Sequence, residues 1–77
     1  MDESPRQQQE EQLSRCNRTW TEVTNTAGYP RDRGIRELQD CIETVRRLDL
    51  LPEETRTEAM LRYSDAIDEL RERHPAY

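Results

Sequence analysis

The stretch Asn25-Thr26-Ala27-Gly28-Tyr29-Pro30 interrupts an otherwise helical pattern and decides how this chain of 77 residues is folded. Gly28 tolerates a positive φ angle, and Pro30 disfavours helical backbone at the residue before it. We therefore predict that the chain reverses its direction at residues 25–30. The segments on either side of the reversal then become neighbouring antiparallel helices.

The segment before the reversal has the spacing of one helix with a single apolar face. Ser4 and Pro5 form a typical helix start, with a capping serine followed by proline at the first helical position. The sequence predicts a helix over about residues 5–24. Residues 1–12 contain almost nothing to bury, so we expect them to be frayed or to form an arm that orders on a partner. The apolar positions follow one another at steps of three and four: Leu13, Cys16, Trp20 and Val23.

A second apolar face follows the reversal and predicts a helix over about residues 33–48. Asp32 stands immediately before this helix, where an aspartate side chain is a good N-terminal cap. The apolar positions again recur at helical steps: Ile35, Leu38, Cys41, Ile42, Val45 and Leu48.

A third helix is predicted over about residues 52–73. Pro52 suits its first position, and the acidic residues that follow suit the positive end of the helix dipole. Arg73 and His74 suit the opposite end, and Pro75 stops the helix. Its apolar positions are Met60, Tyr63, Ile67 and Leu70, flanked by Ala59, Leu61 and Ala66.

These three faces predict an all-α fold in one small domain, residues 1–77. The architecture is a three-helix bundle, or a helical hairpin plus an N-terminal helix, with the second helix between the other two. Only 31% of the residues are hydrophobic and 38% are charged, so the core is thin. A second copy of the chain is therefore a further way to complete the core, which makes a homodimer one of the expected states.

The charge balance excludes several partners. The net charge is -5, and all 12 basic residues are arginines, since the chain has no lysine. An acidic chain repels the phosphates of nucleic acids and anionic membranes, so we expect no general binding to either. The sequence also has no apolar run near the roughly 20 residues of a membrane span and no apolar leader segment. We expect a cytoplasmic protein.

The two cysteines are the most specific pair in the sequence. An antiparallel hairpin with its turn near Tyr29 places Cys16 in the same layer as Cys41. Such a pair either remains reduced within the core or forms a disulfide that closes a loop of about 26 residues and contributes roughly 3 kcal/mol. Because the expected compartment is reducing, we favour the reduced pair. The only histidine, His74, lies far away, so we predict no metal site and no cofactor.

Aromatic and arginine side chains are the candidate contacts for a partner protein, because these residue types are enriched where protein interfaces are strongest. We single out Trp20, Tyr29, Arg33 and Arg36. The alternative for Trp20 is burial in the core, and the alternative for Tyr29 is that it fastens the loop to the end of the bundle. The arginines between residues 31 and 36 alternate with acidic residues. Their helical spacing predicts the surface ion pairs Arg33–Glu37 and Arg36–Asp40.

No pattern in the sequence has the residue types and spacing of a catalytic site, so we expect no enzyme. The preferred function is a small helical protein–protein interaction module: an adaptor, an assembly factor, an inhibitor or an accessory subunit. Its partner is another protein or a second copy of the chain. Two alternatives remain open. One is a nucleic-acid-associated regulator that uses the arginines of residues 31–36, and the other is a thiol–disulfide sensing helical hairpin.

Overall fold

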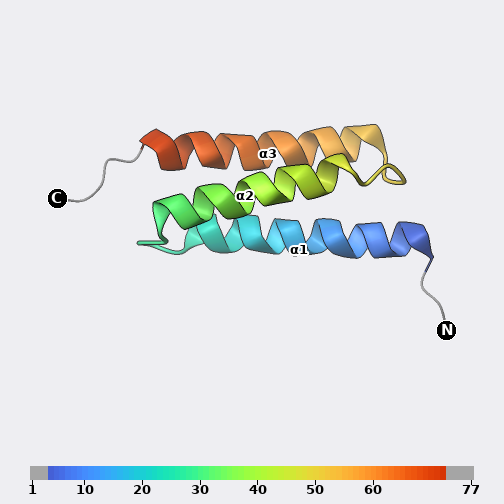
Figure 1. The fold of residues 1–77 in the computed structure, drawn as a ribbon, viewed down its shortest axis with the longest axis horizontal. Coiled ribbons are helices and arrows are strands. Elements are labelled where there is room, and N and C mark those ends of the chain that lie inside the picture. The colour runs from blue at the N-terminus through green and yellow to red at the C-terminus, as the bar shows by residue number, and fades with distance from the viewer. Residues whose placement is uncertain (1–3, 73–77) are drawn as a thin grey trace.

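The computed structural model describes residues 4–72, which form three helices and no strand. The helices are α1 (Pro5–Asn25), α2 (Arg31–Arg46) and α3 (Glu53–Glu72). Each runs antiparallel to the next, and α2 lies between α1 and α3 (Figure 1). The predicted all-α three-helix architecture is confirmed.

The start of α1 and the reversal after it have the predicted chemistry. The Ser4 hydroxyl accepts a hydrogen bond from the backbone N–H of Gln7 at 3.1 Å, and Pro5 is the first helical residue. After α1 ends at Asn25, Gly28 adopts a φ of 79°. A residue with a side chain rarely adopts that angle, so the glycine is what permits the tight reversal.

The prediction that Asp32 caps α2 is wrong. The helix begins two residues earlier than predicted, and the capping position is Pro30, which has a φ of -57°. The Pro30 carbonyl oxygen accepts a hydrogen bond from the backbone N–H of Gly34 at 2.9 Å. Because the proline ring already holds the backbone near helical φ, the helix starts directly after it. Asp32 lies in the first turn, where its charge faces the positive end of the helix dipole.

Pro52 likewise precedes α3 instead of being its first residue. Its carbonyl oxygen accepts a hydrogen bond from the backbone N–H of Arg56 at 3.1 Å. Arg73, His74 and Pro75, which were predicted to end this helix, lie outside the described residues. The helix as described ends at Glu72.

The core contains buried residues from all three helices and from the turn between α2 and α3. The four largest side chains that are completely buried are Tyr63, Leu38, Val23 and Val45. The other buried apolar residues are Cys16, Cys41, Leu48, Leu51, Ala59, Ala66, Ile67 and Leu70, and six partly buried ones pack against them: Leu13, Trp20, Tyr29, Ile35, Ile42 and Met60. The stripes predicted from the sequence thus form the core.

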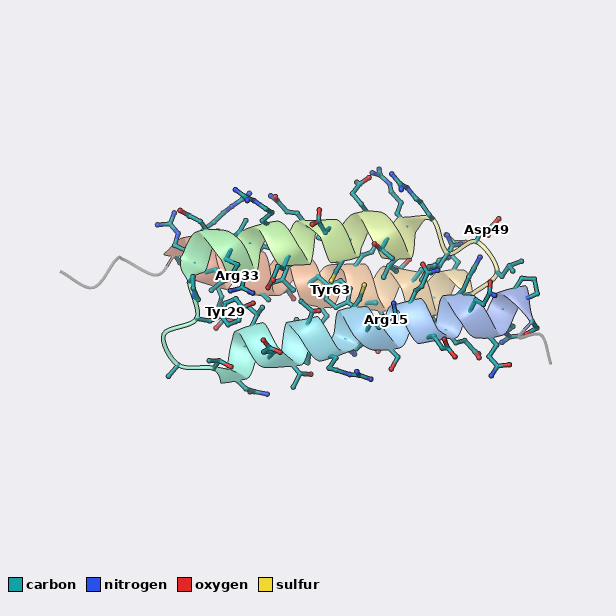
Figure 2. The ribbon with its side chains drawn as sticks, turned by 60° about the horizontal axis from the view of Figure 1, so that its bottom comes forward. Arg15, Tyr29, Arg33, Asp49 and Tyr63 are labelled. Atoms are coloured by element: carbon teal, nitrogen blue, oxygen red, sulfur yellow. The ribbon has the colours of Figure 1, made fainter. Side chains whose placement is uncertain are left out.

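The polar first turns of α1 are attached to the far end of the bundle. The side-chain amide of Gln9 donates a hydrogen bond to a carboxylate oxygen of Asp49 at 3.1 Å. The same amide accepts one from the backbone N–H of Leu50 at 2.8 Å. Asp49 and Leu50 belong to the turn between α2 and α3, which lies beside the start of α1 (Figures 1 and 2). The part of residues 1–12 that the structure describes is therefore helical from Pro5 and anchored by Gln9, although frayed backbone was expected.

Candidate functional site

Tyr29, Arg33 and Glu37 form a closed polar cluster at the end of the bundle where α1 turns into α2 (Figure 2). The Tyr29 hydroxyl donates a hydrogen bond to Glu37, and this bond raises the pKa of Tyr29. The Arg33 Nε lies 3.3 Å from the other Glu37 oxygen, as the i,i+4 spacing predicts. The Arg33 guanidinium also lies 5.9 Å from the centre of the Tyr29 ring. Tyr29 and Arg33, two of the four residues predicted to contact a partner, thus contact each other and the carboxylate of Glu37 in the same chain.

Trp20 and Arg36, the other two predicted contacts, lie apart from this cluster. Trp20 is half-buried against the core, and the guanidinium of Arg62 from α3 lies 5.2 Å from the centre of its ring. Arg36 is exposed on α2. Within the part of the chain that the structure describes, Arg36 makes no ion pair, so the predicted pair with Asp40 is absent. Both side chains are exposed, and water competes with an ion pair between exposed side chains.

Charge is distributed unevenly among the helices. In α2 the four arginines are balanced by four acidic residues, so the cluster at residues 31–36 creates no positively charged helix. In α3 seven acidic residues stand against three arginines. Most of the net negative charge of the protein is therefore on α3.

One face of α3 combines this negative charge with an exposed apolar side chain. Leu61 is 60% exposed, more than any other large hydrophobic residue in the described part of the chain. Exposed carboxylates precede and follow it at helical spacing, and a shallow depression beside it is lined by Glu53, Glu54, Thr57 and Glu58. We call this surface the Leu61 face and define it as Glu54, Glu58, Leu61, Asp65 and Asp68. The sequence predicted Leu61 only as a flank of the apolar stripe.

The structure places Cys16 on α1 beside Cys41 on α2. The Cys16 Sγ lies 4.0 Å from the Cys41 carbonyl oxygen, and the Cys41 Sγ lies 3.9 Å from the Cys16 carbonyl oxygen. Both thiols are free, and each residue is 7% exposed. The hydrogen bond between the two thiols lowers the pKa of Cys16, while the same bond together with burial raises the pKa of Cys41.

Tyr63 carries a hydroxyl group into the centre of the bundle (Figure 2). This hydroxyl donates a hydrogen bond to the side-chain oxygen of Asn17 on α1 at 2.5 Å, which supplies the partner that a buried polar group requires. Burial raises the pKa of Tyr63. Sequence reasoning missed Asn17, although a tyrosine on a buried face is a signal that a polar residue must lie within its reach.

The raised pKa of Tyr63 predicts a loss of stability in alkali. Above the ordinary tyrosine pKa of 10.0 the unfolded chain releases this proton while the folded chain retains it, so rising pH favours the unfolded state. The stabilising contribution is complete below pH 10 and is lost as the pH rises through the folded value. We therefore expect the free energy of unfolding to fall more steeply above pH 10 in the wild type than in Tyr63→Phe.

Urea titrations of both proteins between about pH 8 and pH 11 measure this difference. The ionisable groups that do not contact Tyr63 are common to the two proteins and cancel in the comparison. Parallel pH profiles would mean that the hydroxyl is as hydrated in the folded protein as in the unfolded chain.

Residues 4–72 contain no group of three or more His, Cys, Asp or Glu side chains placed to hold a metal ion. Over the same residues, none of the three helices has the length and apolar character needed to cross a bilayer. Neither a protein-family model nor a curated protein nor a solved structure matches this chain.

Proposed function

We propose that this chain is a non-catalytic protein–protein interaction module, an adaptor, assembly factor, inhibitor or accessory subunit, whose Leu61 face contacts the partner. The observation that supports this proposal is the 60% exposure of Leu61 among carboxylates. Covering a leucine side chain is worth roughly 1.5–3 kcal/mol when burial is complete, so a partner gains most of its apolar contact at this one position.

The charge of the face defines the chemistry of the partner. Only Glu58 among the carboxylates of the Leu61 face is within ion-pair distance of a cation in the described residues, 3.8 Å from Arg62. The remaining carboxylates of the face are available to cations from outside. A protein segment with basic side chains around one apolar residue matches this surface, because the apolar residue covers Leu61 and the basic ones meet the rim.

The same charge disfavours a second copy of the chain as the occupant of this face. Two Leu61 faces brought together place carboxylates opposite carboxylates, which costs free energy when they lose water. A basic nucleic-acid-binding role has little support for the related reason that the arginines of α2 are balanced by acidic residues. Three of the four residues predicted as contacts, Trp20, Tyr29 and Arg33, are engaged within the chain, which also favours the Leu61 face.

The test is a binding titration with a synthetic amphipathic peptide that carries arginines and one leucine face. We expect Leu61→Ala to weaken binding about tenfold, which corresponds to about 1.4 kcal/mol. The matched control is Leu50→Ala, because Leu50 is the other exposed large hydrophobic residue, 47% exposed, and lies in the turn between α2 and α3.

The charge component is tested by repeating the titration at several salt concentrations. We expect affinity to fall with salt, and we expect no binding to duplex DNA at physiological salt. Equal binding by Leu61→Ala and Leu50→Ala would refute the Leu61 face as the contact surface. Tight binding of DNA would support the nucleic-acid alternative instead.

A further inference from the structure

We propose that Cys16 and Cys41 are an oxidation site at which hydrogen peroxide forms an intramolecular disulfide that joins α1 to α2. The inference is independent of the Leu61 face, which lies on α3. It rests on the reciprocal placement of the two residues across the interface of two antiparallel helices.

The geometry brings each sulfur to the backbone of the opposite residue. Each Sγ lies within 4.0 Å of the other residue's carbonyl oxygen, so both side chains point across the same interface. No second covalent link competes, because these two are the only cysteines in the sequence. The chain between them is α1 after Cys16, the turn and the first part of α2, which is a closed hairpin in the fold.

The chemistry proceeds in two steps that balance. The Cys16 thiolate attacks one oxygen of the peroxide and breaks the O–O bond, which gives a sulfenic acid and hydroxide. The Cys41 sulfur then attacks the Cys16 sulfur, so that the S–S bond forms and the S–O bond breaks. The hydroxyl group leaves with the Cys41 proton as water, and the first hydroxide takes up a proton from solvent. Two thiols are oxidised and one peroxide is reduced to two waters.

Peroxide suits this site because it is small. With 7% exposure at each cysteine, a bulky disulfide oxidant has little access to the sulfurs, whereas a molecule near the size of water reaches them through brief local opening. We assign the attack to Cys16, because hydrogen bonding with Cys41 lowers the pKa of its thiol.

The disulfide changes the stability of the bundle. It closes a loop of about 26 residues, and loops of that length restrict the unfolded chain strongly. We expect the melting temperature of the oxidised protein to exceed that of the reduced protein by roughly 10–20 °C. Dithiothreitol is expected to reverse the change, whereas sulfinic and sulfonic acids are not reversed by thiols.

The experiment treats the whole chain with peroxide, blocks the remaining thiols and digests the protein with trypsin. Cleavage after Arg15, Arg18, Arg36 and Arg46 releases each cysteine in its own peptide, residues 16–18 and residues 37–46. Neither peptide contains methionine, so methionine oxidation does not alter their masses. The expected product is the two peptides joined, lighter by about 2 Da than their sum, and separated by dithiothreitol.

Four results would overturn the proposal. They are two blocked thiols after treatment, sulfinic or sulfonic acids on separate peptides, disulfides only between chains, and a joined product that melts at a lower temperature than the reduced protein. Cys41→Ala provides the control for the second step, because Cys16 then stops at the sulfenic acid, which dimedone labels. Since all the deciding results come from the wild-type chain, the test does not depend on the folding of that variant.

Discussion

Replacing Tyr63 by alanine is expected to remove at least about a quarter of the free energy of unfolding. The residue is completely buried, and truncation of a buried aromatic side chain costs roughly 3–5 kcal/mol. A chain of 77 residues is stabilised by only about 4–11 kcal/mol in total. The variant also leaves the Asn17 side-chain oxygen without the hydroxyl that donates to it.

Urea unfolding followed by circular dichroism measures this loss, and two further variants separate its causes. Tyr63→Phe keeps the ring and removes only the hydrogen bond to Asn17, so we expect it to cost about 1 kcal/mol. Leu61→Ala lies on the same helix at the most exposed hydrophobic position and is expected to change stability by no more than about 0.5 kcal/mol. If Tyr63→Ala were as stable as Leu61→Ala, Tyr63 would not be in the core.

The number of helices and their buried faces were predictable from the sequence because they depend on periodic spacing. Apolar residues at steps of three and four define one side of a helix whatever lies opposite it, and the glycine in the reversal has the positive φ that was expected of it. The same reasoning placed Cys16 opposite Cys41, since the turn near Tyr29 fixes the register of the hairpin.

The helix starts were less predictable, because two kinds of cap compete. An aspartate cap at Asp32 and a proline at Pro30 are both reasonable starts for α2, and only the observed hydrogen bond from Gly34 to Pro30 decides between them. Pro52 presents the same ambiguity at α3. Both differences move a boundary by one or two residues and leave the buried faces unchanged.

The polar contacts between different elements could not be predicted, because they join residues far apart in sequence, whereas the Arg33–Glu37 pair follows from its i,i+4 spacing. Gln9 meets the turn that contains Asp49, about 40 residues away, and no periodic pattern marks a single amide for that role. The exposure of Leu61 was missed for a different reason. It lies next to the apolar stripe of α3, and spacing alone does not say how far round the helix its neighbours extend. The Leu61 face, on which the proposed function depends, could therefore be identified only from the structure.

Replacing Gly34 by leucine is expected to destabilise the bundle by roughly 1–3 kcal/mol, although leucine favours a helix by nearly 1 kcal/mol relative to glycine. A Cβ atom at this position would lie 3.0 Å from Leu70 on α3, 3.1 Å from Val23 on α1 and 3.4 Å from Tyr29 in the turn. Neighbours that close on three sides leave no room for a larger side chain. α1 and α3 approach α2 here because the residue is a glycine.

The matched control for Gly34→Leu is Gln39→Leu, which introduces the same side chain at an exposed position of α2. Gly34→Ala adds only the Cβ, and its neighbours on α1 and α3 are methyl groups of Val23 and Leu70 that must shift by a few tenths of an ångström. The cost of that shift and the gain in helix propensity nearly cancel, so we expect Gly34→Ala to lie within about 1 kcal/mol of the wild type. Equal midpoints of urea unfolding for Gly34→Leu and Gln39→Leu would contradict the close approach of the three elements. A loss of stability confined to Gly34→Leu identifies this glycine as the residue that sets the spacing of the helices at this end of the bundle.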